Sequence, residues 1–217
     1  MIDLHTHTIL SDGELLPSEL VRRALVNGYE AIALTDHVDA SNIDFVLPRV
    51  AKAAKELNKF WKIKVIPGVE LSHVPLQDME RLIKFARKNG AKIVVVHGET
   101  ITEPVIPGTN RMAIKCGADV LAHPGHISIA DAKLAAKKNV YLELTTRKNH
   151  RLPNKEVIKA AKKTGARLVL NTDTHRPEDI INDKKARSFL KKLRLTDAQV
   201  NNIFQNSKDL VERAGQR

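Results

Sequence analysis

Short apolar runs that end in histidine or a carboxylate recur along the chain, and they restrict its fold and chemistry more than any other feature. The runs occupy residues 2–7, 31–37, 65–70, 93–97, 120–123 and 168–175. They contain six of the nine histidines, and Asp12 follows the first run closely. Neutral imidazoles and carboxylates, with no cysteine among them, are typical ligands of zinc, manganese and iron. The pattern therefore predicts a cluster of metal ions.

The same runs alternate with amphipathic stretches, and this order predicts an α/β barrel. Strands are expected at residues 2–5, 31–35, 63–70, 92–97, 119–123, 140–144 and 167–172. Each of these segments is continuously apolar, which is typical of parallel strands covered by helices. Several residues just before a strand are expected to close a helix in the left-handed conformation. They are Gly28, Gly90, Gly117, Asn139 and Gly165.

Further local signals complete the expected organisation. A helix is predicted over residues 109–116, a basic helix around 178–192, and a last helix that opens with a capping box at Thr196 and Gln199. Pro67 and Gly68 are interpreted as a kink near the end of the third strand. We expect residues 1–217 to form one barrel domain, with the final helices from about 178 to 217 packing on the barrel.

The composition and the lengths of the apolar segments predict where the protein is located in the cell. No segment is apolar over a length that could cross a membrane, and the chain begins with a predicted strand rather than a signal peptide. Cys116 is the only cysteine, so it is expected to be a small core residue outside any intramolecular disulfide. These features predict a cytoplasmic protein without a membrane partner, and they leave the oligomeric state open.

Positive charge is concentrated in the last third of the chain. The net charge is +11, and residues 147–217 carry 18 Lys and Arg against 8 Asp and Glu. Such an excess can mark a surface for nucleic acid. The lysines mostly occur in pairs and aromatic residues make up only 4% of the chain. Solvated faces of amphipathic helices are therefore the favoured interpretation of this charge.

The ligand-type residues share one position in the predicted repeats. Parallel barrels gather their catalytic groups at the carboxyl ends of the strands. Residues at or just beyond such an end are His5, His7, His37, Glu70, His97, His123, Asp173 and His175. His5 and His7 lie two residues apart on one strand, so both can face one ion. A single histidine there would usually be an ordinary hydrogen-bonded residue, but chance does not explain its recurrence in six runs.

These motifs resemble the polymerase and histidinol phosphatase family, usually called the PHP family. The matching segments are His5-Thr6-His7 with Asp12-Gly13, Thr35-Asp36-His37, Pro67-Gly68-Val69-Glu70, His97, His123-Pro124-Gly125 and Asn171-Thr172-Asp173-Thr174-His175. The resemblance implies a distorted (β/α)7 TIM-like barrel that binds two to three divalent metal ions, which would be zinc, manganese or iron. Within the family, the chain is similar to stand-alone histidinol phosphatases and related small phosphoesterases.

The resemblance also implies how the ligands are divided among the ions. His5, His7, Glu70 and Asp173 would hold one ion; Glu70 would bridge to a second, held also by His97 and His123; Asp12, His37 and His175 would hold a third. Many relatives have histidine at the position of Asp12, so this chain carries one additional negative charge there.

The predicted activity is metal-dependent hydrolysis of a phosphate monoester of a small metabolite, with L-histidinol phosphate as the leading substrate by resemblance. A metal-bound hydroxide would attack the phosphorus, and the predicted catalytic residues are Glu70, His97 and Asp173. Candidate substrate-binding residues, which follow strand ends, are His73, Arg111, His126, Arg147, His150 and Arg176. The long connection over residues 98–111 either shapes substrate access or is simply a rigid loop.

Two other functions stay open at this point. One is a nuclease or 3′-phosphatase that acts on nucleic-acid ends, which the basic last third favours and the scarcity of stacking aromatics weakens. The other is a non-catalytic nucleic-acid-binding protein on a decayed barrel. The intact set of ligand-type residues argues against decay.

Overall fold

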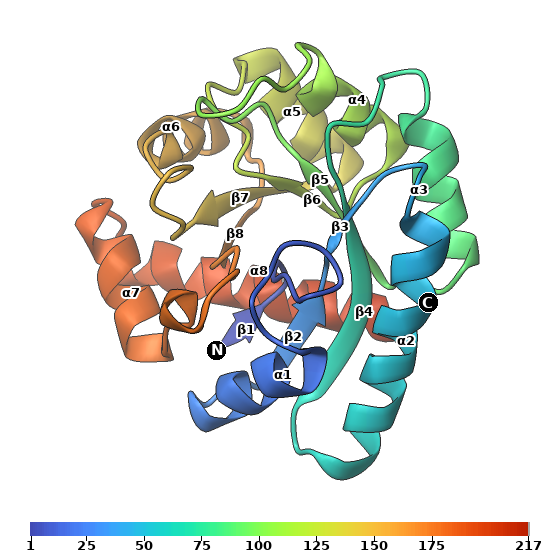
Figure 1. Ribbon diagram of the computed structural model, residues 1–217. Coiled ribbons are helices and arrows are strands. Elements are labelled where there is room, and N and C mark those ends of the chain that lie inside the picture. Colours follow the sequence, from blue (N-terminus) through green and yellow to red (C-terminus); the bar gives the residue numbers. More distant parts are fainter. Residues whose placement is uncertain (217) are drawn as a thin grey trace.

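The computed structural model describes residues 1–216, whose strands form a parallel, nearly closed barrel with helices around it (Figure 1). The strands are β1 (Ile2–Asp3), β2 (Ala31–Leu34), β3 (His37–Val38), β4 (Lys64–Leu71), β5 (Ile93–His97), β6 (Val120–Ala122), β7 (Tyr141–Thr145) and β8 (Leu168–Asn171). Their order around the barrel is β1-β2-β4-β5-β6-β7-β8, and β3 pairs with β4. The predicted α/β barrel is therefore confirmed.

The barrel closes where the chain continues beyond β1 and β8. His7 N donates to Thr174 O at 2.8 Å, and Asp173 N donates to His5 O at 3.1 Å. β1 is shorter than the predicted strand because Leu4 N donates to the Asn171 side chain instead of to a neighbouring strand. The first and last motifs of the chain consequently lie side by side.

The helices follow the predicted alternation with the strands. They are α1 (Pro17–Val26), α2 (Ile43–Phe60), α3 (Met79–Lys88), α4 (Thr109–Cys116), α5 (Ile129–Lys138), α6 (Asn154–Thr164), the short 3-10 helix η1 (Pro177–Asp179), α7 (Asp183–Lys192) and α8 (Asp197–Gly215). All five predicted helix-closing residues have positive φ, and the capping box of Thr196 and Gln199 is present. No helix within residues 1–216 is long and apolar enough to span a membrane.

The prediction for Pro67 and Gly68 needs a correction, because both lie in the middle of β4 rather than near its end. β4 changes partners at this point: Pro67 is opposite Leu34, the last residue of β2, whereas Glu70 is opposite His37 of β3. A Cβ atom on residue 68 would lie 2.8 Å from Ile93 O, so the close approach of β5 requires glycine. Pro67 and Gly68 therefore lie where β4 stops pairing with β2 and begins to pair with β3.

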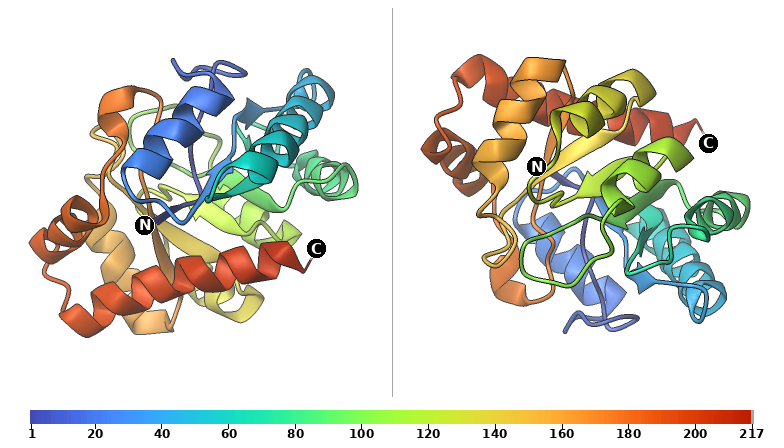
Figure 2. Two further views of the ribbon diagram at one scale, coloured as in Figure 1. Left: turned by 90° about the horizontal axis from the view of Figure 1, so that it is seen from below. Right: turned by 90° about the horizontal axis from the view of Figure 1, so that it is seen from above.

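The interior of the barrel is filled with apolar side chains, and α8 covers its amino-terminal end. Leu4, Ala33, Val95 and Val169 point into the barrel and are fully buried. Leu210 of α8 joins this interior cluster, and Figure 2 shows α8 lying across the amino-terminal ends of the strands. The opposite end, where the carboxyl ends of the strands meet, is therefore left for polar groups.

Candidate metal centre

The structure brings all nine predicted metal ligands together at the carboxyl end of the barrel. Each comes from a different strand end or from the loop that follows it, except that His5, His7 and Asp12 all follow β1, and Asp173 and His175 both follow β8. Seven of the nine are buried, His37 is half-buried, and Asp12 is the exposed member. The barrel closure between β1 and β8 brings His7 beside Asp173.

Four side chains form the centre of this arrangement. His5 Nε2 lies 3.3 Å from Glu70 Oε2 and 3.7 Å from Asp173 Oδ1. His7 Nε2 lies 3.5 Å from the same Glu70 oxygen and 3.3 Å from Asp173 Oδ1. Two imidazole nitrogens and two carboxylates thus face one point, which is a suitable ligand set for a divalent cation.

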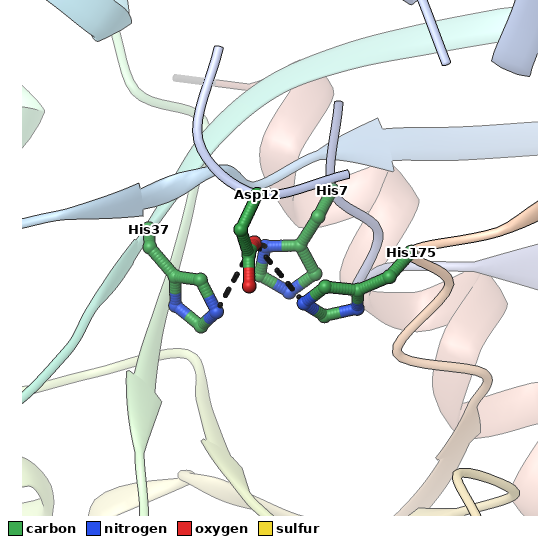
Figure 3. Close-up of side chains that lie close together, drawn as sticks. All are labelled: His7, Asp12, His37 and His175. Atoms are coloured by element: carbon green, nitrogen blue, oxygen red, sulfur yellow. Dashed lines mark ion pairs between the residues drawn. The ribbon is translucent and has the colours of Figure 1, made fainter. Parts of the chain in front are cut away.

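Two further groups flank this centre. On one side, Glu70, His97 and His123 each offer a ligand atom within 4.8 Å of the others, and His123 Nε2 lies 3.7 Å from Glu70 Oε1. On the other side, His7, Asp12, His37 and His175 form a second such group (Figure 3). Asp12 Oδ1 lies 3.1 Å from His175 Nε2 and 3.6 Å from His37 Nε2. Each of these groups offers ligand types that suit a divalent cation, and Glu70 belongs both to the central group and to the group with His97 and His123.

Unpartnered buried atoms test whether these residues fit metal ions. Within residues 1–216, eight buried side-chain nitrogen or oxygen atoms lack a hydrogen-bond partner, and seven of them belong to His5, His7, Glu70, His97 and His123. A buried polar group without a partner costs about 1–3 kcal/mol. Both oxygens of Glu70 are among these atoms. Cations bound at this point would satisfy the nitrogen and oxygen atoms that face them, so the donor set fits divalent ions.

The backbone is strained at the same place. His73, His123 and Asp173 have φ angles of 53°, 25° and 54°, in the left-handed region that side chains with a Cβ seldom adopt. Each such conformation costs on the order of 1 kcal/mol and persists only where the surroundings enforce it. Strain of this kind clusters at functional sites, and here it turns three side chains toward one cavity.

Burial and neighbouring charges push the pKa values of the two central carboxylates apart. Burial has the largest effect on Asp173 and raises its pKa, although His5 and Arg147 oppose the shift. Burial also acts to raise the pKa of Glu70, but His5 and His37 outweigh it and hold that pKa well below its usual range. Two carboxylates this close repel each other when ionised, and a cation between them would remove the penalty.

Sequence reasoning missed Glu143, which orients His5 from behind. Glu143 Oε1 lies 2.8 Å from His5 Nδ1 and accepts a hydrogen bond from Asn171 Nδ2 at the same distance. Its other oxygen accepts from His123 N. A carboxylate bound to one ring nitrogen of a histidine fixes the tautomer and leaves the other nitrogen free for a metal. The signal was available, since Glu143 is the one charged residue in the apolar segment 140–144.

Glu103 was also missed, and it comes from the long connection after β5. Its carboxylate lies 3.2 Å from His97 Nε2 and from His73 Nε2, and 3.4 Å from His150 Nε2. The hydrogen bond with His97 is the largest influence on this carboxyl, and the histidines together lower the pKa of Glu103 to about 2. Nothing in the sequence around residue 103 distinguishes this carboxylate from a solvated loop residue.

The predicted substrate-binding residues divide into two sets. Arg147, His73 and His150 line a cavity of about 330 Å³ over the ligand cluster. Arg147 Nη1 donates to Asp173 O at 3.0 Å and to His175 Nδ1 at 2.5 Å, while His150 Nδ1 lies 2.6 Å from Thr100 Oγ1.

The structure does not bring the second set into this cavity. Arg111 and Arg176 have exposed side chains that pair with Asp131 and Glu14. His126 is likewise exposed and lies 2.6 Å from Glu156 Oε2. These three residues follow strand ends in the sequence, but their side chains point to neighbouring surface segments, so they are left out of the site proposed below.

Comparisons with known proteins agree with this geometry. A family model described as the PHP domain matches residues 3–100. The chain is 44% identical to an uncharacterized protein of Methanocaldococcus jannaschii, a match that covers 97% of this chain and 98% of that protein. It is 31% identical to a "probable phosphatase" of Shewanella halifaxensis, covering 81% of this chain and 77% of that protein.

Among solved structures, one similar chain belongs to the cryo-EM structure of archaeal ribonuclease P with mature tRNA. The match has a TM-score of 0.76 and covers 100% of this chain and 92% of that chain, at 19% sequence identity. At this identity the likeness concerns the fold alone.

Proposed function

The chain belongs to the PHP family, and on this premise we propose that it is a metal-dependent phosphoesterase that hydrolyses a phosphate monoester of a small metabolite. One observation carries the proposal: five strand-end residues of the ligand cluster have buried nitrogen or oxygen atoms without hydrogen-bond partners, below an open cavity. Relatives named probable phosphatases support the reaction class. L-histidinol phosphate is the first substrate to test, because the motifs resemble stand-alone histidinol phosphatases.

We assign the ions to the three groups of side chains described above. His5, His7, Glu70 and Asp173 would hold the central ion, His97 and His123 would share Glu70 with a second, and Asp12, His37 and His175 would hold a third. When bound, divalent ions supply positive charge for the phosphoryl oxygens and acidify water. Glu70, His97 and Asp173 are the residues proposed as essential for turnover.

The remaining side chains of the cavity would bind and orient the substrate. The Arg147 guanidinium is held by Asp173 O and His175 Nδ1 at the cavity wall, where its remaining N–H groups can donate to non-bridging phosphate oxygens. Burial lowers the pKa of His150 to about 4, so its ring is neutral near pH 7. Thr100 fixes one ring nitrogen, and Nε2 is left to face the cavity and Glu103.

Glu103 would control the charge at the mouth of the cavity. Its carboxylate lies within 3.4 Å of three histidine nitrogens, so it places negative charge at that wall and would repel a second anionic group there. Phosphate must therefore approach from the side of Arg147 and His175. This asymmetry gives the cavity one preferred orientation for an ester.

A metal and substrate panel tests the proposal. The protein is purified, its bound metals are measured by mass spectrometry, and hydrolysis of p-nitrophenyl phosphate and L-histidinol phosphate is followed with manganese, zinc and iron. His97→Ala is compared with His126→Ala, because both remove a histidine but only His97 belongs to the ligand cluster. We expect metal loss and loss of turnover in His97→Ala alone, with both variants folded.

The opposite results would overturn the assignment. Wild-type protein that retains no divalent ion after loading would contradict the metal centre. Wild-type turnover in His97→Ala, with its metal content measured, would contradict the role of that residue.

A further inference from the structure

A second cavity, of about 360 Å³, lies beside the metal centre, between the loop after β7 and helix α7. Its charged lining residues are Arg147, Lys148, Arg151, Glu178, Asp179, Lys185 and Lys192. Arg147 lines this cavity and also the one over the ligand cluster, so the two cavities meet at its side chain. A group bound in the second cavity would therefore adjoin the phosphate at the first.

Among the residues that the structure describes, four of the five cations of this cavity are left without carboxylate partners, whereas Arg147 lies 3.6 Å from Asp173 Oδ2 and 4.0 Å from Asp179 Oδ2. Within residues 1–216, the side chains of Lys148, Arg151, Lys185 and Lys192 form no ion pair within 4.0 Å. Neighbouring basic residues of α7 are paired instead: Arg187 with Asp183 at 2.7 Å, and Lys191 with Asp197 at 2.6 Å. The five cations outnumber the two carboxylates of the lining, so the concave wall carries uncompensated positive charge that attracts an anion.

Helix geometry concentrates polar groups on the wall of the cavity. Lys185, Ser188, Phe189 and Lys192 are spaced at intervals of three, four and seven residues, which places them on one face of α7. Ser188 offers a hydroxyl group, and the half-buried ring of Phe189 offers a small apolar surface between the two lysines. This combination suits an organic group that carries a phosphate.

We propose that the second cavity binds a further phosphate group of the substrate, so that the preferred substrates carry at least two phosphates. The inference rests on the proposed function: one phosphate ester would be hydrolysed at the metal centre, while the other phosphate is held unchanged by Lys148, Arg151, Lys185 and Lys192. The guanidinium of Arg147 would lie between the two. The second phosphate can come from a small bisphosphorylated molecule or from the next nucleotide of an oligonucleotide.

Matched substrates and matched variants test this site. The kcat/KM values of glucose 6-phosphate and glucose 1,6-bisphosphate are compared, and likewise those of thymidine 5′-phosphate and a 5′-phosphorylated thymidine trinucleotide. The pocket variant is Lys185→Gln with Lys192→Gln. The control variant, Lys184→Gln with Lys191→Gln, removes two charges with the same spacing from a different face of α7.

We expect the wild-type protein to prefer one of the two substrates that carry a further phosphate over its matched monophosphate by about tenfold, equivalent to ~1.4 kcal/mol. The pocket variant should lose most of this preference, and the control variant should keep it. Added salt should reduce the preference, because exposed charge pairs are screened. Direct binding of the bisphosphate and of the trinucleotide, measured by calorimetry, should weaken in the pocket variant only, and the stronger ligand identifies the source of the second phosphate.

The outcomes separate this inference from the proposed function. A wild-type protein that hydrolyses none of the four esters and neither p-nitrophenyl phosphate nor L-histidinol phosphate contradicts the phosphoesterase assignment. A protein that hydrolyses the monophosphates and shows no preference for a second phosphate overturns the second site alone. Equal loss of preference in the pocket and control variants would also overturn it, because the effect would then reflect overall charge.

Discussion

The two ends of this barrel follow opposite rules of packing. At the amino-terminal ends of the strands, Ala31 and Ile93 are buried among other apolar side chains, and Leu210 of α8 packs with them. At the carboxyl ends, equally buried side chains such as His5, His7 and Glu70 have polar atoms without hydrogen-bond partners. The amino-terminal end of the barrel, here called its floor, therefore contributes to stability. The carboxyl end, its rim, holds polar groups that lower the stability of the fold until a ligand binds them. The contrast predicts that stability and the proposed activity can be changed separately in this molecule.

The largest expected effect concerns the rim, and it tests whether activity resides there. Asp173→Asn keeps the shape of the side chain and tolerates the positive φ, but it removes one negative charge from the central ligand group. We expect kcat/KM to fall by more than about a thousandfold. Burial raises the pKa of Asp173, so the neutral amide should leave the metal-free protein equally or more stable in urea unfolding.

Asp44→Asn provides the control for this change, because Asp44 is exposed in the first turn of α2. If Asp173→Asn unfolded the metal-free protein, the proposed separation of activity at the rim from stability at the floor would be wrong. Wild-type turnover in the same variant would remove the rim from the mechanism.

The next prediction concerns the floor. Leu210→Ala should lower the free energy of unfolding by about 2–5 kcal/mol, because it opens a cavity between α8 and the interior of the barrel. The molecules that remain folded should keep their kcat/KM within about twofold, since the ligand groups lie at the opposite end. Urea unfolding and turnover are measured on the same preparation, with Leu152→Ala, an exposed position, as the control. A selective loss of activity at full stability would contradict the division.

Metal removal should lower the stability of the folded protein, because ions that bind only the folded state stabilise it. A divalent ion at about a hundred times its Kd stabilises the folded state by ~2.7 kcal/mol, which corresponds to a Tm change of roughly 5–10 °C for a chain of this size. We therefore expect EDTA to lower the Tm of the wild-type protein and to have little effect on Asp173→Asn. Calorimetric scans with and without EDTA check this. An identical response of both proteins would place the stabilising ion outside the central group.

The smallest expected effect concerns Glu143, which contacts His5 on the side away from the ligand group. Glu143→Gln keeps the volume of the side chain but weakens the hold on His5 Nδ1. Changes of this kind cost about 10–100-fold in metal affinity. Competition with a chromogenic chelator measures the affinity, and Glu80→Gln, on the exposed face of α3, is the control. Unchanged affinity would show that His5 is oriented by the barrel backbone alone.

Much of the fold was predictable because the sequence repeats one physical pattern. Continuous apolar runs specify parallel strands, and residues such as Gly28 and Asn139 mark where helices close. The strand β3 was not predicted, because two residues paired with the second half of β4 leave no periodicity to detect. The position of Pro67 within its strand was wrongly predicted for a related reason. β4 continues past Pro67 because it changes partners where β2 ends, and that point is set by tertiary pairing.

The site was predictable only as far as strand ends determine position. His5 and His97 follow directly from the barrel geometry. Loop residues do not, since Arg147 points into the cavity whereas Arg111 turns to Asp131 on the neighbouring helix. Glu103 approaches three histidines because its long connection folds back over the rim, and no local signal encodes that path.

The hydrogen bonds that join the segments after β1 and β8 also set the order in which the site can mature during synthesis. A nascent chain that has left the ribosome only as far as β7 already carries His5, His7 and Glu70, but it lacks Asp173 and His175. It also lacks the backbone partners that fix the first motif, since His7 N and His5 O bond to residues 174 and 173. The central ligand group and the group around Asp12 can therefore be completed only after residues 173–175 have been synthesised, and a product truncated before β8 would lack both.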